Sequence, residues 1–316
     1  MKSIKNKLRY ILIALLLSVS CLALAPANAN VIRFVTLGDM PYRLADEALF
    51  ANLITEINRT NPAFTIFVGD TKSGGSPCTN EYLESIWKSF NRFESPLIYT
   101  PGDNEWTDCH RPSAGSFDPE ERLRFIRQLY FQNSNSLGKK PLRLIRQADI
   151  DPEHKLFVEN AYWVSGTTLF ATVHVVGSNN NFENASEYAM RNLANLAWLD
   201  YVVKVAQDRA LDHLVIAMQA DLFYSPEQAS SPKSGLRDTI ARLNQLLSQW
   251  SKPALVIHGD SHQLIIDQPF KHPGTKRVIE RAYRIQVMGD HQVEALEITI
   301  DSGKRSPFSF RPLVIR

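Results

Sequence analysis

Short apolar segments typical of β-strands alternate with longer segments of helical periodicity along most of this chain. The strand-like segments are rich in β-branched and aromatic residues and comprise 31–37, 64–68, 96–100, 168–176, 213–218, 253–258, 283–288 and 293–300. Between them, helices are predicted at 44–59, 80–92, 118–132, 186–210 and 232–250. This alternation predicts an α/β protein with a mostly parallel core and crossover helices, in which the last two strands form a hairpin.

Four of the predicted strands end in the dipeptide Gly-Asp, which gives Asp39, Asp70, Asp103 and Asp260. The carboxyl ends of parallel strands meet at one edge of an α/β sheet, and ligands bind at that edge. One Gly-Asp after a strand is ordinary turn chemistry, but four at separate strand ends favour a shared site. Four converging carboxylates raise one another's pKa values unless a cation lies between them. The pattern therefore predicts a site for divalent metal.

The order of these motifs, with GDNE at 102–105 and GDSH at 259–262, resembles that of the calcineurin-like metallophosphoesterases. The likeness extends over nearly the whole chain after its first 30 residues. It implies a four-layer αββα sandwich that forms one domain over residues 30–316. It also implies hydrolysis of a phosphate ester by in-line attack of water on phosphorus, with metal ions neutralising the phosphate oxygens.

Carried over position by position, the resemblance is partial. Asp39 matches the first acid of the family pattern, but Pro41 replaces the His of its GDxH motif. Asp70 matches the acid that bridges the two metal ions. In GDSH, Asp260 replaces the first His of the family's GHxH motif, whereas His262 matches the second.

The motif GDNE departs furthest from the family pattern, which is GNH[DE]. Asp103 replaces the ligand Asn, Asn104 replaces the His that protonates the leaving group, and Glu105 matches the final acid. An amide has no acidic proton to give, so Asn104 is expected to act as a catalytic residue beside Asp70 by hydrogen-bonding a phosphate oxygen. The leaving-group proton then needs another source, for which no spacing selects among His110, His258 and His291.

A further ligand position of the family, an isolated His after an apolar strand, has two candidates here. His174 lies in the segment TVHVVGSNN, whereas Gln219 lies in HLVIAMQADLF. In the family this strand follows a long helix, which corresponds here to residues 192–206, so chain order favours Gln219. His174 is then expected to lie inside a sheet and to hydrogen-bond a neighbour.

The predicted metal ligands offer oxygen at every position but one, and they are Asp39, Asp70, Asp103, Gln219, Asp260 and His262. Imidazole-rich sites suit Zn and Fe, whereas carboxylate and amide oxygens suit Mg, Mn and Ca. One or two divalent ions of the second kind are therefore expected. If the pocket holds no metal, the acids must be protonated or paired with a cation, for which Lys72 is a candidate.

The first 30 residues differ from the rest of the chain. Four basic residues and no acidic one accompany an apolar run, and Ala27-Asn28-Ala29 has the small-x-small pattern that signal peptidases cut. Residues 1–29 are therefore predicted to be a signal peptide that directs export, to a periplasm or by secretion. The alternatives are an uncleaved anchor and a lipoprotein at Cys21. No other long apolar run follows, so no membrane span is expected after cleavage.

The charge balance bears on which kinds of molecule the protein binds, and the two cysteines bear on whether it contains a disulfide. The predicted signal peptide carries four of the 35 basic residues, which leaves 31 basic against 33 acidic residues. This balance does not indicate a nucleic-acid partner, and the resemblance implies a phosphorylated small molecule. Cys78 and Cys109 are expected to pair in an exported protein, with two free buried thiols as the alternative. The sequence does not indicate an oligomeric state.

Two functions from different classes fit these residues. The first is an exported metal-dependent phosphoesterase that hydrolyses a phosphate ester or anhydride at an altered, oxygen-rich site. The second is a non-catalytic binding protein of the cell envelope that holds a cation or a phosphorylated or polyol ligand. A purely structural protein leaves the gathering of acids unexplained. Geometry separates the first two: four carboxylates around one centre require a cation, whereas Lys72 in that centre favours the binding protein.

Overall fold

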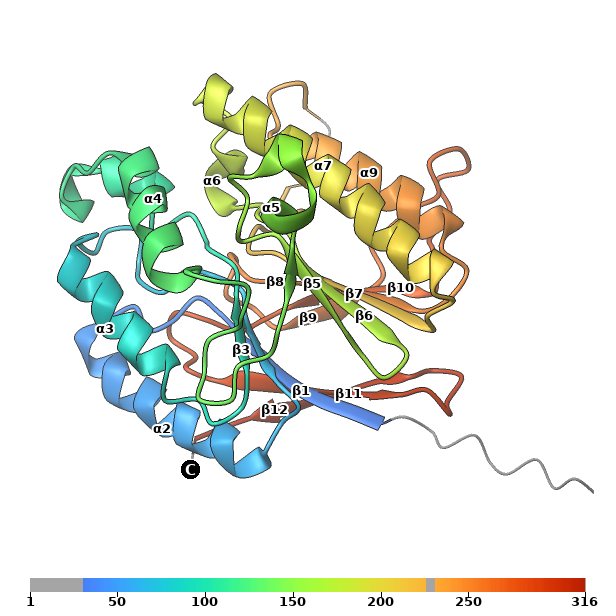
Figure 1. Ribbon diagram of the computed structural model, residues 1–316, viewed down its shortest axis with the longest axis horizontal. Coiled ribbons are helices and arrows are strands. Elements are labelled where there is room, and N and C mark those ends of the chain that lie inside the picture. Colours follow the sequence, from blue (N-terminus) through green and yellow to red (C-terminus); the bar gives the residue numbers. More distant parts are fainter. Residues whose placement is uncertain (1–30, 226–230, 316) are drawn as a thin grey trace, which may run out of the picture.

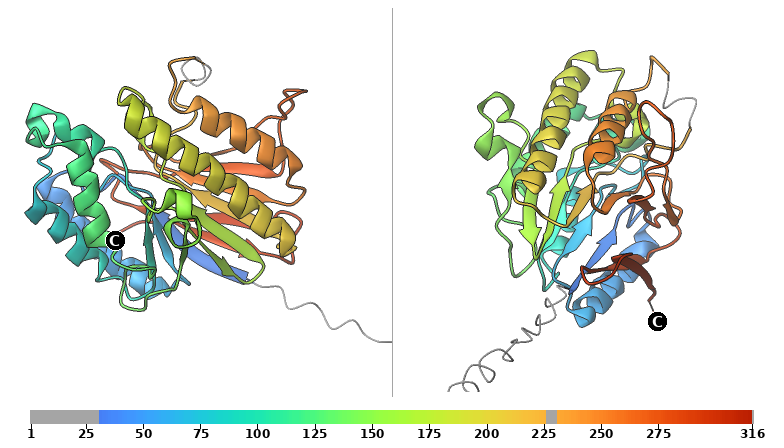
Figure 2. Two further views of the ribbon diagram at one scale, coloured as in Figure 1. Left: turned by 45° about the horizontal axis from the view of Figure 1, so that its top comes forward. Right: turned by 90° about the vertical axis from the view of Figure 1, so that its right-hand side faces the viewer.

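The computed structural model describes residues 31–225 and 231–315, so the predicted signal peptide lies outside the described residues. Two mixed β-sheets pack face to face, and helices cover the outer face of each sheet (Figures 1 and 2). Three apolar clusters fill the spaces between these layers. The architecture is a four-layer αββα sandwich, which confirms the predicted fold class.

The first sheet has five strands in the order β12-β11-β1-β2-β3, with parallel pairing from β1 to β3 and antiparallel pairing from β1 to β12. These strands are β1 (Val31–Leu37), β2 (Thr65–Phe67), β3 (Leu97–Tyr99), β11 (Ala295–Asp301) and β12 (Phe308–Leu313). Three helices bury apolar side chains against this sheet: α2 (Leu44–Thr60), α3 (Asn80–Phe90) and α4 (Pro119–Tyr130). All three helices were expected within two residues of these bounds.

The second sheet has seven strands in the order β4-β5-β6-β7-β8-β10-β9, of which β6, β7, β8 and β10 are parallel. Its strands are β4 (Ile145–Arg146), β5 (Ala161–Ser165), β6 (Thr168–Thr172), β7 (His213–Ala217), β8 (Ala254–His258), β9 (Ile265–Asp267) and β10 (Ala282–Gln286). The helices α7 (Ala185–Asp208) and α9 (Arg237–Gln249) pack on its outer face. Within the described ranges, no helix combines the length and apolar content needed to cross a membrane.

The two sheets share a core rich in aromatic rings. The rings of Phe64 and Phe170 lie 4.8 Å apart between centroids, and Trp163 stacks on Phe170 at 5.4 Å. Because both faces of the central strands are covered, these strands read as continuous apolar runs rather than as alternating ones. This rigid core fixes the carboxyl ends of the parallel strands in both sheets.

The predicted hairpin between residues 283–288 and 293–300 is wrong. β10 pairs with β8 and β9 in the seven-stranded sheet, whereas β11 pairs with β1 and β12 in the five-stranded sheet. The short connection crosses from one sheet to the other, and the backbone N–H of Asp290 donates to the carbonyl of Asp39 at 2.8 Å. Sheets stack about 10 Å apart, so a few residues bridge two sheets as easily as they form a turn. The actual terminal hairpin is formed by β11 and β12.

Several short elements escaped the sequence analysis. They include β4, β5, β9 and β12, the helices α5 (Gln147–Ile150) and α6 (Gly177–Asn180), and three 3₁₀ turns at Thr107–His110, Pro112–Ala114 and Pro152–His154. β6 ends at Thr172 rather than at residue 176. The four residues beyond it lead the chain toward the carboxyl ends of the strands, where α6 lies.

Candidate metal centre

The four Gly-Asp dipeptides meet where the carboxyl ends of both sheets come together. Asp39, Asp70 and Asp103 follow β1, β2 and β3 of the first sheet, and Asp260 follows β8 of the second. The first three side chains are buried, whereas Asp260 is partly exposed. We call these four carboxylates the acid centre.

The backbone at these positions is unusual. Asp39, Asp70 and Asp260 have left-handed conformations with φ of 55°, 58° and 78°, which non-glycine residues rarely adopt and which often mark functional sites. Two of the glycines allow a carboxylate to approach the backbone closely. A Cβ on Gly102 would lie 2.0 Å from Oδ1 of Asp70, and one on Gly259 would lie 2.1 Å from Oδ2 of Asp39. Glycine is therefore required so that carboxylates and neighbouring backbones fit together.

The acid centre contains two overlapping groups of possible ligand atoms. In each group, the atoms lie within 4.8 Å of one another. One group comprises Asp39, Asp70 and His262, and the other comprises Asp70, Asp103 and Asp260. Asp70 belongs to both, so the side chains are close enough to hold a divalent metal, with Asp70 shared if two ions bind.

Asp70 accepts hydrogen bonds from three neighbouring side chains. Its Oδ2 accepts from Tyr42 Oη at 3.1 Å, from Asn104 Nδ2 at 2.9 Å and from Gln219 Nε2 at 3.1 Å. The backbone N–H of Asn104 donates to Oδ1 at 3.2 Å. This ring of donors fixes the carboxylate that the two groups share.

Gln219 presents its amide nitrogen, rather than its oxygen, to the acids. Its Nε2 also donates to Oδ1 of Asp260 at 3.3 Å, while the backbone N–H of Gly177 donates to its Oε1. Binding a metal through Oε1 would require the amide to flip and to give up the Gly177 bond. The role of Gln219 as a ligand therefore stays a prediction, and its present contacts make it a donor to two carboxylates.

Burial and crowding change the acidity of the centre. Burial, followed by the charge of Asp260, raises the pKa of Asp39 well above its ordinary value, and burial and Asp103 do the same for Asp70. Burial and Asp103 raise the pKa of Asp260 to about 7. Without a cation, the raised pKa values of Asp39, Asp70 and Asp260 favour the protonated carboxyl groups, and a metal ion would displace those protons.

Lys72 does not fill the acid centre. Its side chain is buried, and Nζ donates to the backbone carbonyls of Ser73 and Asn104 at 2.8 and 2.7 Å. In the part of the chain that the structure describes, it forms no ion pair with an acid. The arrangement that was expected to favour a metal-free binding protein is thus not found.

Three buried carboxylate oxygens beside or within the acid centre are free to bind a cation. Oδ2 of Asp39, Oδ1 of Asp103 and Oε2 of Glu105 have no hydrogen-bond partner among the described residues. The other oxygen of Glu105 accepts from Tyr99 Oη at 2.6 Å and from the backbone N–H groups of Asp70 and Gly102. Buried carboxylate oxygens normally have partners, so the donor set fits a divalent ion.

The remaining histidines lie away from the acid centre. His174 is buried and its Nδ1 lies 2.7 Å from Oε1 of Glu159, so it hydrogen-bonds a neighbour as expected. His110 and His291 are exposed, and burial lowers the pKa of the buried His258 to about 4. Among the described residues, none of these histidines hydrogen-bonds an acid-centre carboxylate. Chain order favoured Gln219 over His174 for the ligand position, and the structure places the Gln219 side chain against Asp70 and Asp260 and that of His174 against Glu159.

Two contacts to the centre were missed by the sequence analysis. Tyr42 Oη lies 3.1 Å from both His262 Nε2 and Asn104 Nδ2, and Ser178 Oγ donates to Oδ2 of Asp103 at 2.6 Å. Ser178 begins a Ser-Asn-Asn-Asn run whose residues all have positive φ. Asn tolerates that conformation better than most residues do, so the run was an available signal of a special turn.

A disulfide joins two loops beside the centre. Cys78 and Cys109 are bonded, as expected, and both are buried. The bond links the loop after β2 to the loop after β3, and both sulfurs lie within 3.7 Å of the carbonyl of Asn104. It therefore braces the segment that carries Asp103 and Asn104.

Comparison with solved structures identifies the fold. Matches include PhoD (TM-score 0.56, 11% identity, 87% of this chain and 65% of that one) and GAP50, the anchor in the inner membrane complex of Plasmodium (0.52, 14%, 90% and 89%). A dimetal phosphatase from Danio rerio matches with a TM-score of 0.51 at 12% identity over 90% of this chain and 99% of that one. No protein-family model and no curated sequence matches. The chain has the metallophosphoesterase fold, of the calcineurin-like type.

Proposed function

We propose that this protein is an exported metal-dependent phosphoesterase that hydrolyses a phosphate ester or anhydride at the acid centre. The observation that carries the proposal is the pair of overlapping ligand groups that share Asp70. Shared carboxylates of this kind hold two ions on either side of a reacting phosphate in binuclear hydrolases. The fold supports the same activity. One of the matching structures is named as a dimetal phosphatase, and another is PhoD.

The chain offers a defined set of ligands for one or two ions. Asp39, Asp70 and His262 would hold one ion, and Asp70 with Asp103 and Asp260 would hold the other. This donor set is mostly carboxylate, which suits Mg, Mn or Ca better than Zn or Fe. A bound divalent ion would neutralise phosphate oxygens and lower the pKa of a coordinated water.

Two side chains beside the centre would act on the phosphate. Asn104 Nδ2 and Tyr42 Oη are donors that already contact Oδ2 of Asp70. Burial and the nearby acids raise the pKa of Tyr42 well above 10, so its hydroxyl keeps its proton and donates. Both groups would orient a phosphate oxygen and stabilise its charge.

The leaving group would depart without a histidine to protonate it. A general acid contributes roughly 10²–10⁴-fold to the rate of such a reaction. Asn104 has no acidic proton to give, and His262, the histidine of the ligand groups, would be engaged by a metal ion. The missing proton would slow the hydrolysis of alkyl phosphates most, whereas substrates with good leaving groups, such as aryl phosphates and phosphoanhydrides, would be slowed least.

Two features of the chain support export. The leader-like residues 1–29 support it, and the disulfide between Cys78 and Cys109 belongs to an oxidising compartment. A periplasm fits both features, and secretion is the alternative.

A second candidate is a binding protein of the cell envelope that uses the same centre without catalysis. The replacement of the proton-donating histidine by Asn104 favours it. So does the match to GAP50, which is named as an anchor. This candidate predicts metal binding or ligand binding without turnover.

The deciding experiment measures hydrolysis of an aryl phosphate monoester and diester by the purified protein with Mg, Mn, Ca or Zn added. The proposal predicts turnover with a hard cation and its loss in the variant Asp70→Asn. Absence of turnover with every ion, together with no metal-dependent rise in melting temperature, would overturn it.

A further inference from the structure

A cavity of about 360 Å³ adjoins the acid centre. Asp260 and Gly177 belong both to its wall and to the edge of the acid centre, since a Cβ on Gly177 would lie 2.5 Å from Oδ1 of Asp260 and 2.9 Å from Oδ1 of Asp103. A phosphate held at the acids would therefore place its ester group at this cavity. The cavity is the space available for the group that the phosphate esterifies.

One wall of the cavity is a left-handed turn. Ser178, Asn179, Asn180 and Asn181 have φ of 47°, 58°, 55° and 53°, which makes α6 a left-handed segment. Several successive non-glycine residues in this conformation are costly, and such strain persists only where the surroundings impose it. The turn brings Ser178 and Asn179 into the lining of the cavity.

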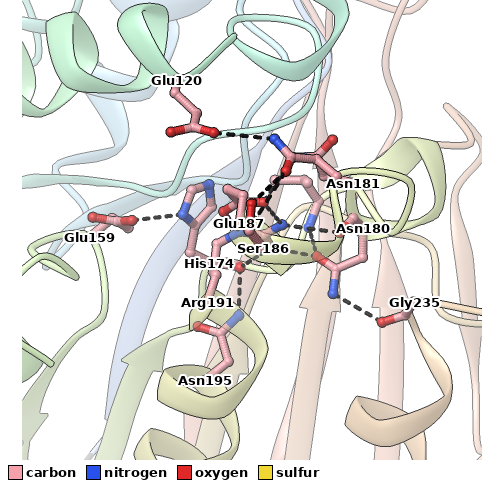
Figure 3. Close-up of polar contacts among 12 residues, drawn as sticks. Glu120, Glu159, His174, Asn180, Asn181, Ser186, Glu187, Arg191, Asn195 and Gly235 are labelled. Carbon is pink, nitrogen blue, oxygen red and sulfur yellow. Dashed lines mark hydrogen bonds and ion pairs between the residues drawn. The ribbon is translucent and has the colours of Figure 1, made fainter. Parts of the chain in front are cut away.

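Buried polar contacts impose the turn, as Figure 3 shows. The buried guanidinium of Arg191 donates through Nη1 to Oδ1 of Asn180 and through Nη2 to its carbonyl at 3.0 Å. Asn180 Nδ2 donates to the carbonyl of Gly235 at 3.0 Å. The N–H of Gly235 donates to Oδ1 of Asn179 at 2.9 Å. These bonds tie the turn to Gly235, whose neighbours Ser234 and Leu236 also line the cavity, so the cavity is pre-organised.

The polar lining presents hydrogen-bond acceptors. Ser178 Oγ donates its hydrogen bond to Oδ2 of Asp103 at 2.6 Å, and Ser261 Oγ donates to Oδ2 of Asp221 at 2.6 Å. Each hydroxyl oxygen keeps lone pairs that accept from a ligand. The carboxylate of Asp221 adds acceptors, with Arg284 Nη1 3.7 Å behind it. A ligand that donates several hydrogen bonds complements this wall.

The rest of the lining limits the charge and shape of that ligand. No lysine or arginine is among the described residues that line the cavity, so a second phosphate or a carboxylate would meet acids without a counter-charge. Leu222, Leu236 and the ring of Tyr224, which is 74% exposed, provide apolar surface. A compact ring with hydroxyl groups and exposed C–H surface fits both parts of the lining.

We infer that this cavity is a subsite for a neutral polyhydroxylated group, so that the substrate is the phosphate ester of a sugar or cyclic polyol. The inference rests on the proposed function for its catalytic consequence. The subsite itself is formed by the left-handed turn, Asp221 and Ser261 and binds the alcohol portion whether or not turnover occurs.

The test compares the phosphate esters of two six-membered carbon rings, myo-inositol 1-phosphate and cyclohexyl phosphate, with Mg²⁺ present. Hydroxyl-specific sites discriminate strongly against analogues that lack the hydroxyl groups, so kcat/KM is expected to favour the polyol ester by at least about tenfold. Ser261→Ala should reduce that preference, measured as the ratio of kcat/KM for the two esters, several-fold. Comparing the ratios cancels the intrinsic difference between the two leaving groups.

A second measurement separates this inference from the proposed function. Binding of free myo-inositol and of cyclohexanol, followed by ligand-observed NMR, needs no phosphate and no turnover. Preferential binding of myo-inositol that Ser261→Ala and Tyr224→Ala weaken would support the subsite even if the protein hydrolyses nothing. Equal binding of both alcohols, or a kcat/KM for cyclohexyl phosphate as high as that for the polyol ester, would overturn it.

Discussion

The side-chain amide of Asn104 donates a 2.9 Å hydrogen bond from Nδ2 to Oδ2 of Asp70, the carboxylate shared by both ligand groups. The backbone N–H of Asn104 donates to the other oxygen of the same carboxylate at 3.2 Å. Asn104 is therefore built into the centre at the position where the family that the sequence resembles has a proton-donating histidine. Its amide can orient a phosphate but cannot protonate the group that leaves.

Replacing Asn104 with His should restore part of the missing acid catalysis. Alkyl phosphates, whose leaving groups need a proton, should gain about tenfold or more in kcat, whereas aryl phosphates should change little. The measurement is the ratio of kcat for an alkyl and an aryl phosphate in the wild type and in Asn104→His. Asn104→Ala is the control and should slow both substrates; equal gains for both in Asn104→His would contradict a specific lack of a proton donor.

Gly177→Ala should abolish metal binding at the second ligand group (Asp70, Asp103 and Asp260) with little loss of fold. Its Cβ would lie within 2.9 Å of carboxylate oxygens of Asp103 and Asp260, in space that a cation at this group needs. The matched control is Gly75→Ala, whose Cβ would meet only Ser113 Oγ at 3.8 Å. Isothermal titration with Mn²⁺ should give no binding for the first variant at the second ligand group and normal binding for the control. Normal titration of Gly177→Ala would place the metal elsewhere.

The disulfide should stabilise both the fold and the centre. It closes a loop with a sequence separation of 31 residues, for which chain entropy gives a stabilisation of roughly 3–4 kcal/mol. The double variant Cys78→Ala/Cys109→Ala should lose about that free energy of unfolding in urea titrations. Because the bond braces the Asn104 segment, metal affinity should also fall. A free energy of unfolding unchanged within about 0.5 kcal/mol would show that packing alone holds these loops.

A buried ion pair outside the centre should make stability depend on acid pH. Burial alone would raise the pKa of Glu159, but Arg127 at 2.6 Å and His174 at 2.7 Å hold that pKa far below its ordinary 4.5. In the unfolded chain Glu159 takes up its proton near pH 4.5 while the folded protein keeps it ionised. The pair's stabilisation is therefore fully present above that pH and is lost as the pH falls below it.

The variant Glu159→Gln measures this contribution. At pH 7 it leaves buried charge without a partner and should cost about 3–5 kcal/mol. Its deficit relative to the wild type should shrink at pH 4 and below, as seen by urea unfolding at each pH. The control is Glu120→Gln, since Glu120 is exposed and accepts only a surface bond from Asn184. A deficit for Glu159→Gln that is constant with pH would show that the interaction is not ionic.

The alternation of strands and helices was enough to predict an α/β protein and the meeting of the four Asp residues, whereas the four-layer αββα sandwich was implied by the resemblance to the metallophosphoesterases. The sequence did not predict the side-chain contacts between residues that are far apart in the chain and are brought together by irregular turns. Ser178 reaches Asp103 across 75 positions through a left-handed turn that buried Arg191 imposes. The direction of the Gln219 amide depends on one backbone N–H, that of Gly177. The pairing of the last strands was mispredicted because β11 joins β1 in the five-stranded sheet. Spacing along the chain does not indicate which sheet a strand joins.

The central claim is that the acid centre holds divalent cations through the carboxylate of Asp70. The most direct measurement is the melting temperature and titration calorimetry of the metal-free protein with Mg²⁺, Mn²⁺, Ca²⁺ and Zn²⁺, beside Asp70→Asn. The account predicts binding of one or two hard cations with release of protons near neutral pH, a rise in melting temperature, and loss of both in the variant. No binding to the wild type, or equal binding to Asp70→Asn, would contradict it.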